Sequence, residues 1–147
     1  MKQLFILILI FSLLGCTSQE EKQARKLLEE LELNQANHLY LIIPNSGCGG
    51  CISDAENFAI RNLDNPNLKV IFTAFSSKKN LRIHLGERFY HPNTVIDSNS
   101  YVKRNGLLSI YLIAILMKDG EVKKQIEFSP KTKDVFFECS NFLGSLK

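Results

Sequence analysis

This sequence has few prolines and few glycines, 4 and 8 among 147 residues, and neither sign of charge is in large excess. Disordered, collagenous and low-complexity proteins are therefore excluded, since 45% of the residues are hydrophobic and can form a core. The 18 basic and 15 acidic residues nearly balance, and no basic run is interleaved with aromatic residues. Nucleic acid is not expected as a partner. The length suits one domain with a single core.

Motifs of several enzyme classes are also missing. The sequence contains no glycine-rich phosphate loop, no Ser/His/Asp arrangement and no pair of hydrolase carboxylates. We therefore expect the protein to work without a cofactor and without a bound metal ion.

One long apolar run is present, and it lies at the N-terminus. Leu4–Leu14 follows the basic residue Lys2 and has 11 residues. A membrane-spanning helix needs about 20 residues, so the run is too short to cross a bilayer. Its length and basic flank are typical of a secretory signal.

The apolar run ends in Leu13-Leu14-Gly15-Cys16, which resembles the lipobox of bacterial lipoproteins. In such proteins, cleavage before the cysteine leaves it as the new N-terminus, carrying acyl chains such as palmitate. The resemblance implies a signal peptide over 1–15, a lipid anchor on Cys16 and a location outside the cytoplasm, on a bacterial cell membrane. The alternative is a conventional signal peptide followed by an incidental cysteine.

Hydrophobic periodicity predicts alternating helices and strands in the rest of the chain. Apolar residues three and four apart predict helices over 17–34, 52–65 and 78–89 and a closing helix after Pro130. Continuous apolar runs predict buried strands over 38–43, 68–75, 94–97 and 109–117. The dipeptide Asp119-Gly120 predicts a hairpin leading into 121–128. This order predicts an α/β fold with a central mixed sheet flanked by helices.

Two cysteines, Cys48 and Cys51, lie where the first predicted strand passes into a helix. The N-terminus of that helix supplies unpaired N–H groups and a positive partial charge, which favour the thiolate form of Cys48. The two-residue spacing brings Cys51 back across the first turn, close enough for a disulfide. A nucleophile and a resolving thiol are thus predicted within one turn.

A Cys-x-x-Cys pair in this order of elements resembles the thioredoxin fold, and in particular its secreted, membrane-tethered thiol-disulfide oxidoreductases. The resemblance covers residues 36–147, preceded by an N-terminal segment over 16–35 that holds the first helix. It implies that Cys48 attacks a disulfide, that Cys51 resolves the mixed disulfide, and that the two form a redox-active disulfide. The implied partners are protein thiols or disulfides of the cell envelope.

The sequence departs from this family at four places. The family's cis-proline position falls within 110–112, where no proline stands, and we expect a trans peptide there. Gly47 replaces the common tryptophan, no carboxylate occurs over 38–43, and the motif interior at 49–50 is Gly-Gly. Attack and resolution remain possible, so a specialised or slow enzyme fits better than a general reductase. A vestigial pair is the other interpretation.

Three non-oxidoreductase interpretations remain open. A binding module of this fold could keep the pair as a structural disulfide, and a copper-handling protein could use both thiolates with His91. A zinc site is the third and is less favoured, because it needs four ligands and His38, His84 and His91 are each isolated in the sequence.

The remaining polar and thiol residues near the predicted elements have structural interpretations. Cys139 lies on the apolar stripe of the last helix and is expected to be a buried, inert thiol. Asp54 and Glu56 oppose the helix dipole, with a role as proton acceptor for Cys51 as the alternative. Ser46 is expected to cap the helix or to hydrogen-bond the thiolate.

Overall fold

The computed structural model describes residues 18–47, 49–130, 132 and 134–146. The predicted signal peptide lies outside this range. The helices are α2 (Gln19–Glu30), α3 (Gly49–Asn62), α4 (Lys78–Leu85), α5 (Tyr101–Arg104) and α6 (Val135–Ser145), with a 3-10 helix η1 (Gly86–Tyr90) after α4. The strands are β1 (His38–Pro44), β2 (Leu68–Thr73), β3 (Thr94–Ile96), β4 (Leu112–Lys118) and β5 (Glu121–Phe128).

Strand β1 lies at the centre of a five-stranded sheet of order β3-β2-β1-β4-β5. The pairs β1–β2 and β2–β3 are parallel, whereas β1–β4 and β4–β5 are antiparallel. Every residue of β1 is buried, as required of a strand covered on both faces. The predicted α/β architecture is confirmed, including the antiparallel C-terminal hairpin and the closing helix.

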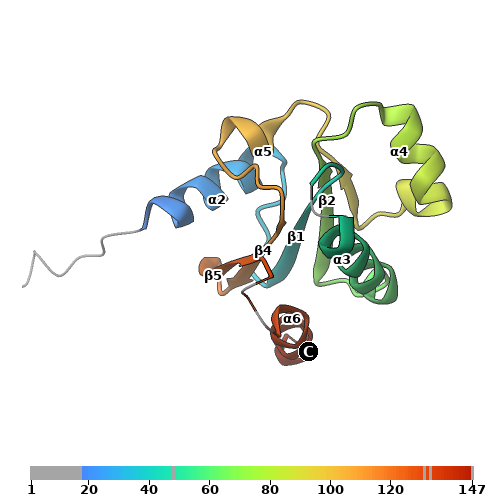
Figure 1. Cartoon of the computed structure of the whole chain (residues 1–147). Helices are drawn as coiled ribbons and strands as arrows, with labels where there is room; N and C mark the ends of the chain where they lie inside the picture. The colour runs from blue at the N-terminus through green and yellow to red at the C-terminus, as the bar shows by residue number, and fades with distance from the viewer. Residues whose placement is uncertain (1–17, 48, 131, 133, 147) are drawn as a thin grey trace, which may run out of the picture.

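Alternation along β1 divides the core into two layers, because successive side chains of a strand point to opposite faces. Leu39, Leu41 and Ile43 pack with residues of α3, α4 and α6. Tyr40 and Ile42 pack with residues of α2 and α5. Figure 1 shows the same arrangement, with α2 and α5 on one side of the sheet and α3 and α6 on the other.

Helix α2 belongs to this core. Ser18 caps it by accepting a hydrogen bond from the Glu21 amide (3.1 Å), and its apolar stripe of Ala24, Leu27 and Leu28 is fully buried. The Arg25 guanidinium donates to the carbonyl of Gly120 (3.0 Å) in the β4–β5 turn. The predicted N-terminal helix therefore packs on the same sheet as the region after residue 36. No helix within the described residues is long and apolar enough to span a bilayer.

Two predicted elements have bounds whose difference from expectation has a clear local cause. The helix expected over 78–89 stops at Leu85, because Gly86 adopts a positive φ of 57° and the chain continues as η1. The strand expected from Ser109 begins only at Leu112. Ser109 Oγ accepts a hydrogen bond from the amide of Tyr111 (3.0 Å). Because this amide bonds locally, it does not pair with a neighbouring strand.

His38 is the one buried histidine of the described chain. Its side chain stacks on Tyr40 with ring centroids 5.7 Å apart, and neither ring nitrogen has a hydrogen-bond partner among the described residues. Burial lowers the pKa of His38 from 6.5, and the charge of Lys69 lowers it further. The backbone groups of Pro66 and Asn37, although they do not reach hydrogen-bond geometry with the ring, oppose this lowering of the pKa in part.

We expect the protein to lose stability as the pH falls from 6.5 through the lower pKa of folded His38. Over that window the unfolded chain binds a proton that the folded protein does not, so protonation favours unfolding. In urea unfolding at a series of pH values, a His38→Phe variant should show a shallower decline. The exposed residue Ile83, changed to Gln, adds and removes no titratable group; it is the control and should leave the decline unchanged. Parallel profiles for His38→Phe and the wild type would contradict this account.

Candidate functional site

The predicted redox motif lies at the carboxyl end of the central strand. Helix α3 begins at Gly49, earlier than predicted, so Cys51 falls in its first turn, where it is half buried. Cys48 and the predicted lipidation residue Cys16 lie outside the described residues. The structure thus places the predicted resolving cysteine at a strand-to-helix junction, the position where open α/β sheets carry their chemistry.

The loop before α3 approaches the chain segment that precedes β4. Gly47 has a φ of 151°, and a Cβ atom there would overlap the carbonyl oxygen of Ile110 and lie 3.0 Å from its carbonyl carbon. Only glycine fits this contact, because the obstructing atoms are backbone atoms. The peptide bonds over 110–112 are trans, as predicted. Ile110 is 58% exposed, which leaves apolar surface beside the loop at Gly47.

A buried carboxylate exists in the described structure, on the face away from α3. Asp97 accepts hydrogen bonds from Thr73 Oγ1 (2.9 Å) and from the amides of Tyr101 (2.8 Å) and Val102 (3.1 Å). Because Phe72 packs on the α3 side, strand alternation turns Thr73 toward α5. Asp97 therefore holds the start of α5 and does not substitute for the carboxylate missing from β1.

Two further residues considered from the sequence have other contacts. Both carboxylate oxygens of Glu56 lie 3.1 Å from His84 Nε2, which joins α3 to α4. Ser46 Oγ donates to the carbonyl of Ala74 (3.4 Å), which ties the loop before α3 to the loop after β2. These contacts support structural roles for both side chains.

Cys139 is confirmed as a buried thiol. It is fully buried on α6, in the layer between that helix and the sheet. Burial, followed by the negative charge of Glu138, raises the pKa of Cys139 to about 12. The thiol stays protonated at physiological pH and is a poor nucleophile.

The structure places His91 away from Cys51, which argues against a copper site that uses both residues. His91 Nε2 lies 3.3 Å from Asp64 Oδ1, and His91 Nδ1 accepts a hydrogen bond from the amide of Asn93 (3.1 Å). Asp64 follows the C-terminal end of α3, whereas Cys51 lies in the first turn, roughly 15 Å away along the helix at 1.5 Å per residue. No group of three or more His, Cys, Asp or Glu side chains in the described residues is arranged to hold a metal ion.

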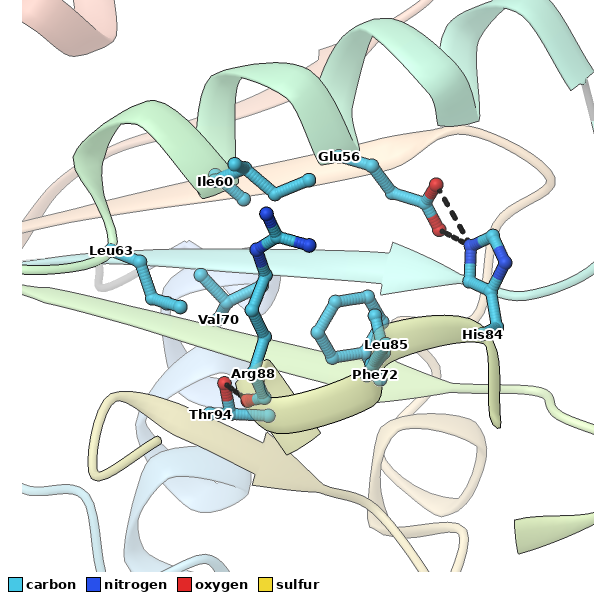
Figure 2. Close-up of a pocket in the computed structure, with 10 residues that line it drawn as sticks. Glu56, Ile60, Leu63, Val70, Phe72, His84, Leu85, Arg88 and Thr94 are labelled. Carbon is cyan, nitrogen blue, oxygen red and sulfur yellow. Dashed lines mark hydrogen bonds and ion pairs between the residues drawn. The ribbon is translucent and has the colours of Figure 1, made fainter. Parts of the chain in front are cut away.

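A cavity not predicted from the sequence lies between α3, the α4–η1 segment and β2 (Figure 2). Its volume is about 120 Å³. Ala59, Leu63, Val70, Phe72 and Leu85 contribute apolar side chains to its wall. Figure 2 shows the Arg88 side chain rising from η1 toward Ile60, and the Glu56–His84 pair bridging the gap at the other end. No local pattern marks these residues, because they come from five separate elements.

Comparison with known proteins supports the fold. No protein-family model matches the sequence, and no curated protein matches it either. The solution structure of a "putative thioredoxin" from Neisseria meningitidis superposes with a TM-score of 0.50, over 72% of this chain and 75% of that one, at 19% identity. The chain therefore has a thioredoxin-like fold. At this identity the likeness concerns the fold alone.

Substitutions of two glycines around the motif should have opposite effects on stability. Gly47→Ala should destabilise by about 2 kcal/mol, because its Cβ meets backbone at Ile110. Gly50→Ala should stabilise by about 0.5 kcal/mol, since open space surrounds that position in α3 and alanine favours the helix. Urea unfolding at matched redox state measures both. Equal stability of the two variants would show that the close approach of Gly47 to Ile110 does not restrict position 47 to glycine.

Cys139 should resist alkylation in the folded protein. In the reduced wild type at pH 8, iodoacetamide should modify Cys139 only after denaturant is added, because the thiol is buried and protonated. Peptide mass spectrometry with and without denaturant reads out the modification. Labelling of Cys139 under native conditions would mean that α6 opens readily.

Proposed function

We propose that the protein is a membrane-anchored, extracytoplasmic thiol-disulfide oxidoreductase in which Cys48 is the attacking thiol and Cys51 the resolving thiol. One observation carries the proposal: Cys51 lies in the first turn of the helix that follows the central strand of a thioredoxin-like fold. The sequence puts its partner cysteine three residues earlier, at the strand-to-helix junction.

The proposed reaction is an exchange of disulfides. The Cys48 thiolate attacks one sulfur of a partner's disulfide, and the other partner sulfur leaves as a thiolate. The Cys51 thiolate then attacks the Cys48 sulfur, which releases the second partner thiolate and leaves a Cys48–Cys51 disulfide. Two electrons have passed to the partner. The same steps in reverse oxidise a partner dithiol.

The surroundings of the motif favour a slow or partner-specific enzyme. No carboxylate of β1 is available to take the proton of Cys51, and the buried Asp97 is engaged on the opposite face. Without a carboxylate at that position on β1, resolution should be slower and the mixed disulfide should last longer. The exposed side chain of Ile110 offers an apolar surface to a partner segment beside the motif.

The proposed anchor would hold the domain close to the membrane. Two residues separate Cys16 from the start of α2 at Gln19. A link of this length spans about 10 Å at most. The partners reached from this position would be proteins of the cell envelope near the membrane surface.

A Cys51→Ser variant should trap mixed disulfides with partner proteins when expressed in its native envelope, because the second exchange step is removed. Non-reducing gels should show higher-mass bands that disappear on reduction. A Cys48→Ser/Cys51→Ser double variant should lose these bands, and Cys139→Ser should behave as the wild type because that thiol is buried. Absence of trapped species, or bands that persist in the double variant, would contradict the proposal.

The reduction potential separates this function from a structural disulfide. A working couple should equilibrate with glutathione or dithiothreitol at a potential more oxidising than about −300 mV. A lower value would identify the pair as a structural bond in a binding module.

A further inference from the structure

We infer that the cavity between α3, the α4–η1 segment and β2 binds a small organic carboxylate whose apolar part is about the size of a benzene ring. The inference concerns a face of α3 away from the cysteine chemistry and does not depend on the proposed redox function. Three properties of the cavity carry it: its walls, its unpaired cation and the position of its carboxylate.

The walls and the volume suit a compact apolar group. Ala59, Leu63, Val70, Phe72 and Leu85 line the cavity, and its volume is about 120 Å³. An apolar protein cavity of about 150 Å³ stays free of water and takes up benzene. A phenyl group or a branched aliphatic chain therefore fits this space, whereas a larger fused ring system does not.

The mouth of the cavity presents a cation without an acidic partner. Among the described residues, the Arg88 guanidinium makes no ion pair and no hydrogen bond. Its main chain is held by Thr94, whose Oγ1 donates to the Arg88 carbonyl (2.7 Å), and Figure 2 shows the side chain crossing toward Ile60. A planar guanidinium above an apolar wall is suited to a carboxylate, which it can bind through two parallel hydrogen bonds.

The Glu56–His84 pair at the other end of the cavity determines the sign of the ligand's charge and the orientation of the ligand in the cavity. The Glu56 carboxylate already accepts the Nε2–H of His84. A cationic ligand would therefore find this acid occupied and would be repelled by Arg88. An anionic ligand is kept away from Glu56, so its carboxylate must lie at the Arg88 end with its apolar group between Leu63 and Phe72.

Titration with 3-phenylpropionate, followed by amide shifts in NMR spectra, tests this inference. Saturable shifts should map to the amides of Ala59, Val70, Leu85 and Arg88. The neutral analogue 3-phenylpropan-1-ol should bind about fivefold more weakly, the modest difference expected of an exposed ion pair. Arg88→Gln should remove that preference for the carboxylate and leave the affinity for the alcohol unchanged.

Two further variants make the test specific. Arg82→Gln removes the same charge from the neighbouring α4 surface outside the cavity and should keep the preference. Ala59→Leu should fill the cavity and abolish binding of both compounds, with the thermal midpoint recorded to show that it folds. The inference is overturned if neither compound gives saturable shifts, if the alcohol binds the wild type as well as the carboxylate, or if Arg88→Gln keeps the preference. Shifts centred on Lys78 and Lys79 would also overturn it, since they would report only attraction to a basic surface.

Discussion

The structure depends on β1 being buried on both faces. All seven of its residues are buried, and their alternation requires helices on each side of the sheet. The helices α2 and α5 meet this requirement on one face, and α3, α4 and α6 meet it on the other. Because β1 is central, the loop at its carboxyl end lies between the parallel and the antiparallel halves of the sheet, and this loop leads into the cysteine motif.

Backbone proximity shapes the candidate redox site more than polar groups do. Gly47 brings the loop before α3 against Ile110, on the segment that enters β4. This contact places Ile110, whose side chain is exposed, beside the loop that leads into the motif. Of the acids in the described residues, Asp97 holds the start of α5, and Glu56 binds His84.

Helix α3 takes part in two separate features. Its first turn carries Cys51, and its later turns form one wall of the apolar cavity closed by Arg88 and the Glu56–His84 pair. Ala55 and Ala59 are the residues by which the same helix packs on the sheet. The cavity lies beside this contact, between α3, the α4–η1 segment and β2.

Local pattern determined most of the architecture and the position of the motif. Buried runs, helical periodicity and the Asp119-Gly120 turn predicted the elements, since each depends on residues close together in the chain. The same reasoning placed Cys51 at a strand-to-helix junction and Cys139 in the core, both as found. Only the tertiary structure decided that Gly47 must be glycine, that Asp97 faces α5, that His91 lies far from Cys51, and that a cavity exists beside α3. Each of these depends on which distant segments become neighbours when the strands pair, and sequence periodicity carries no information about that pairing.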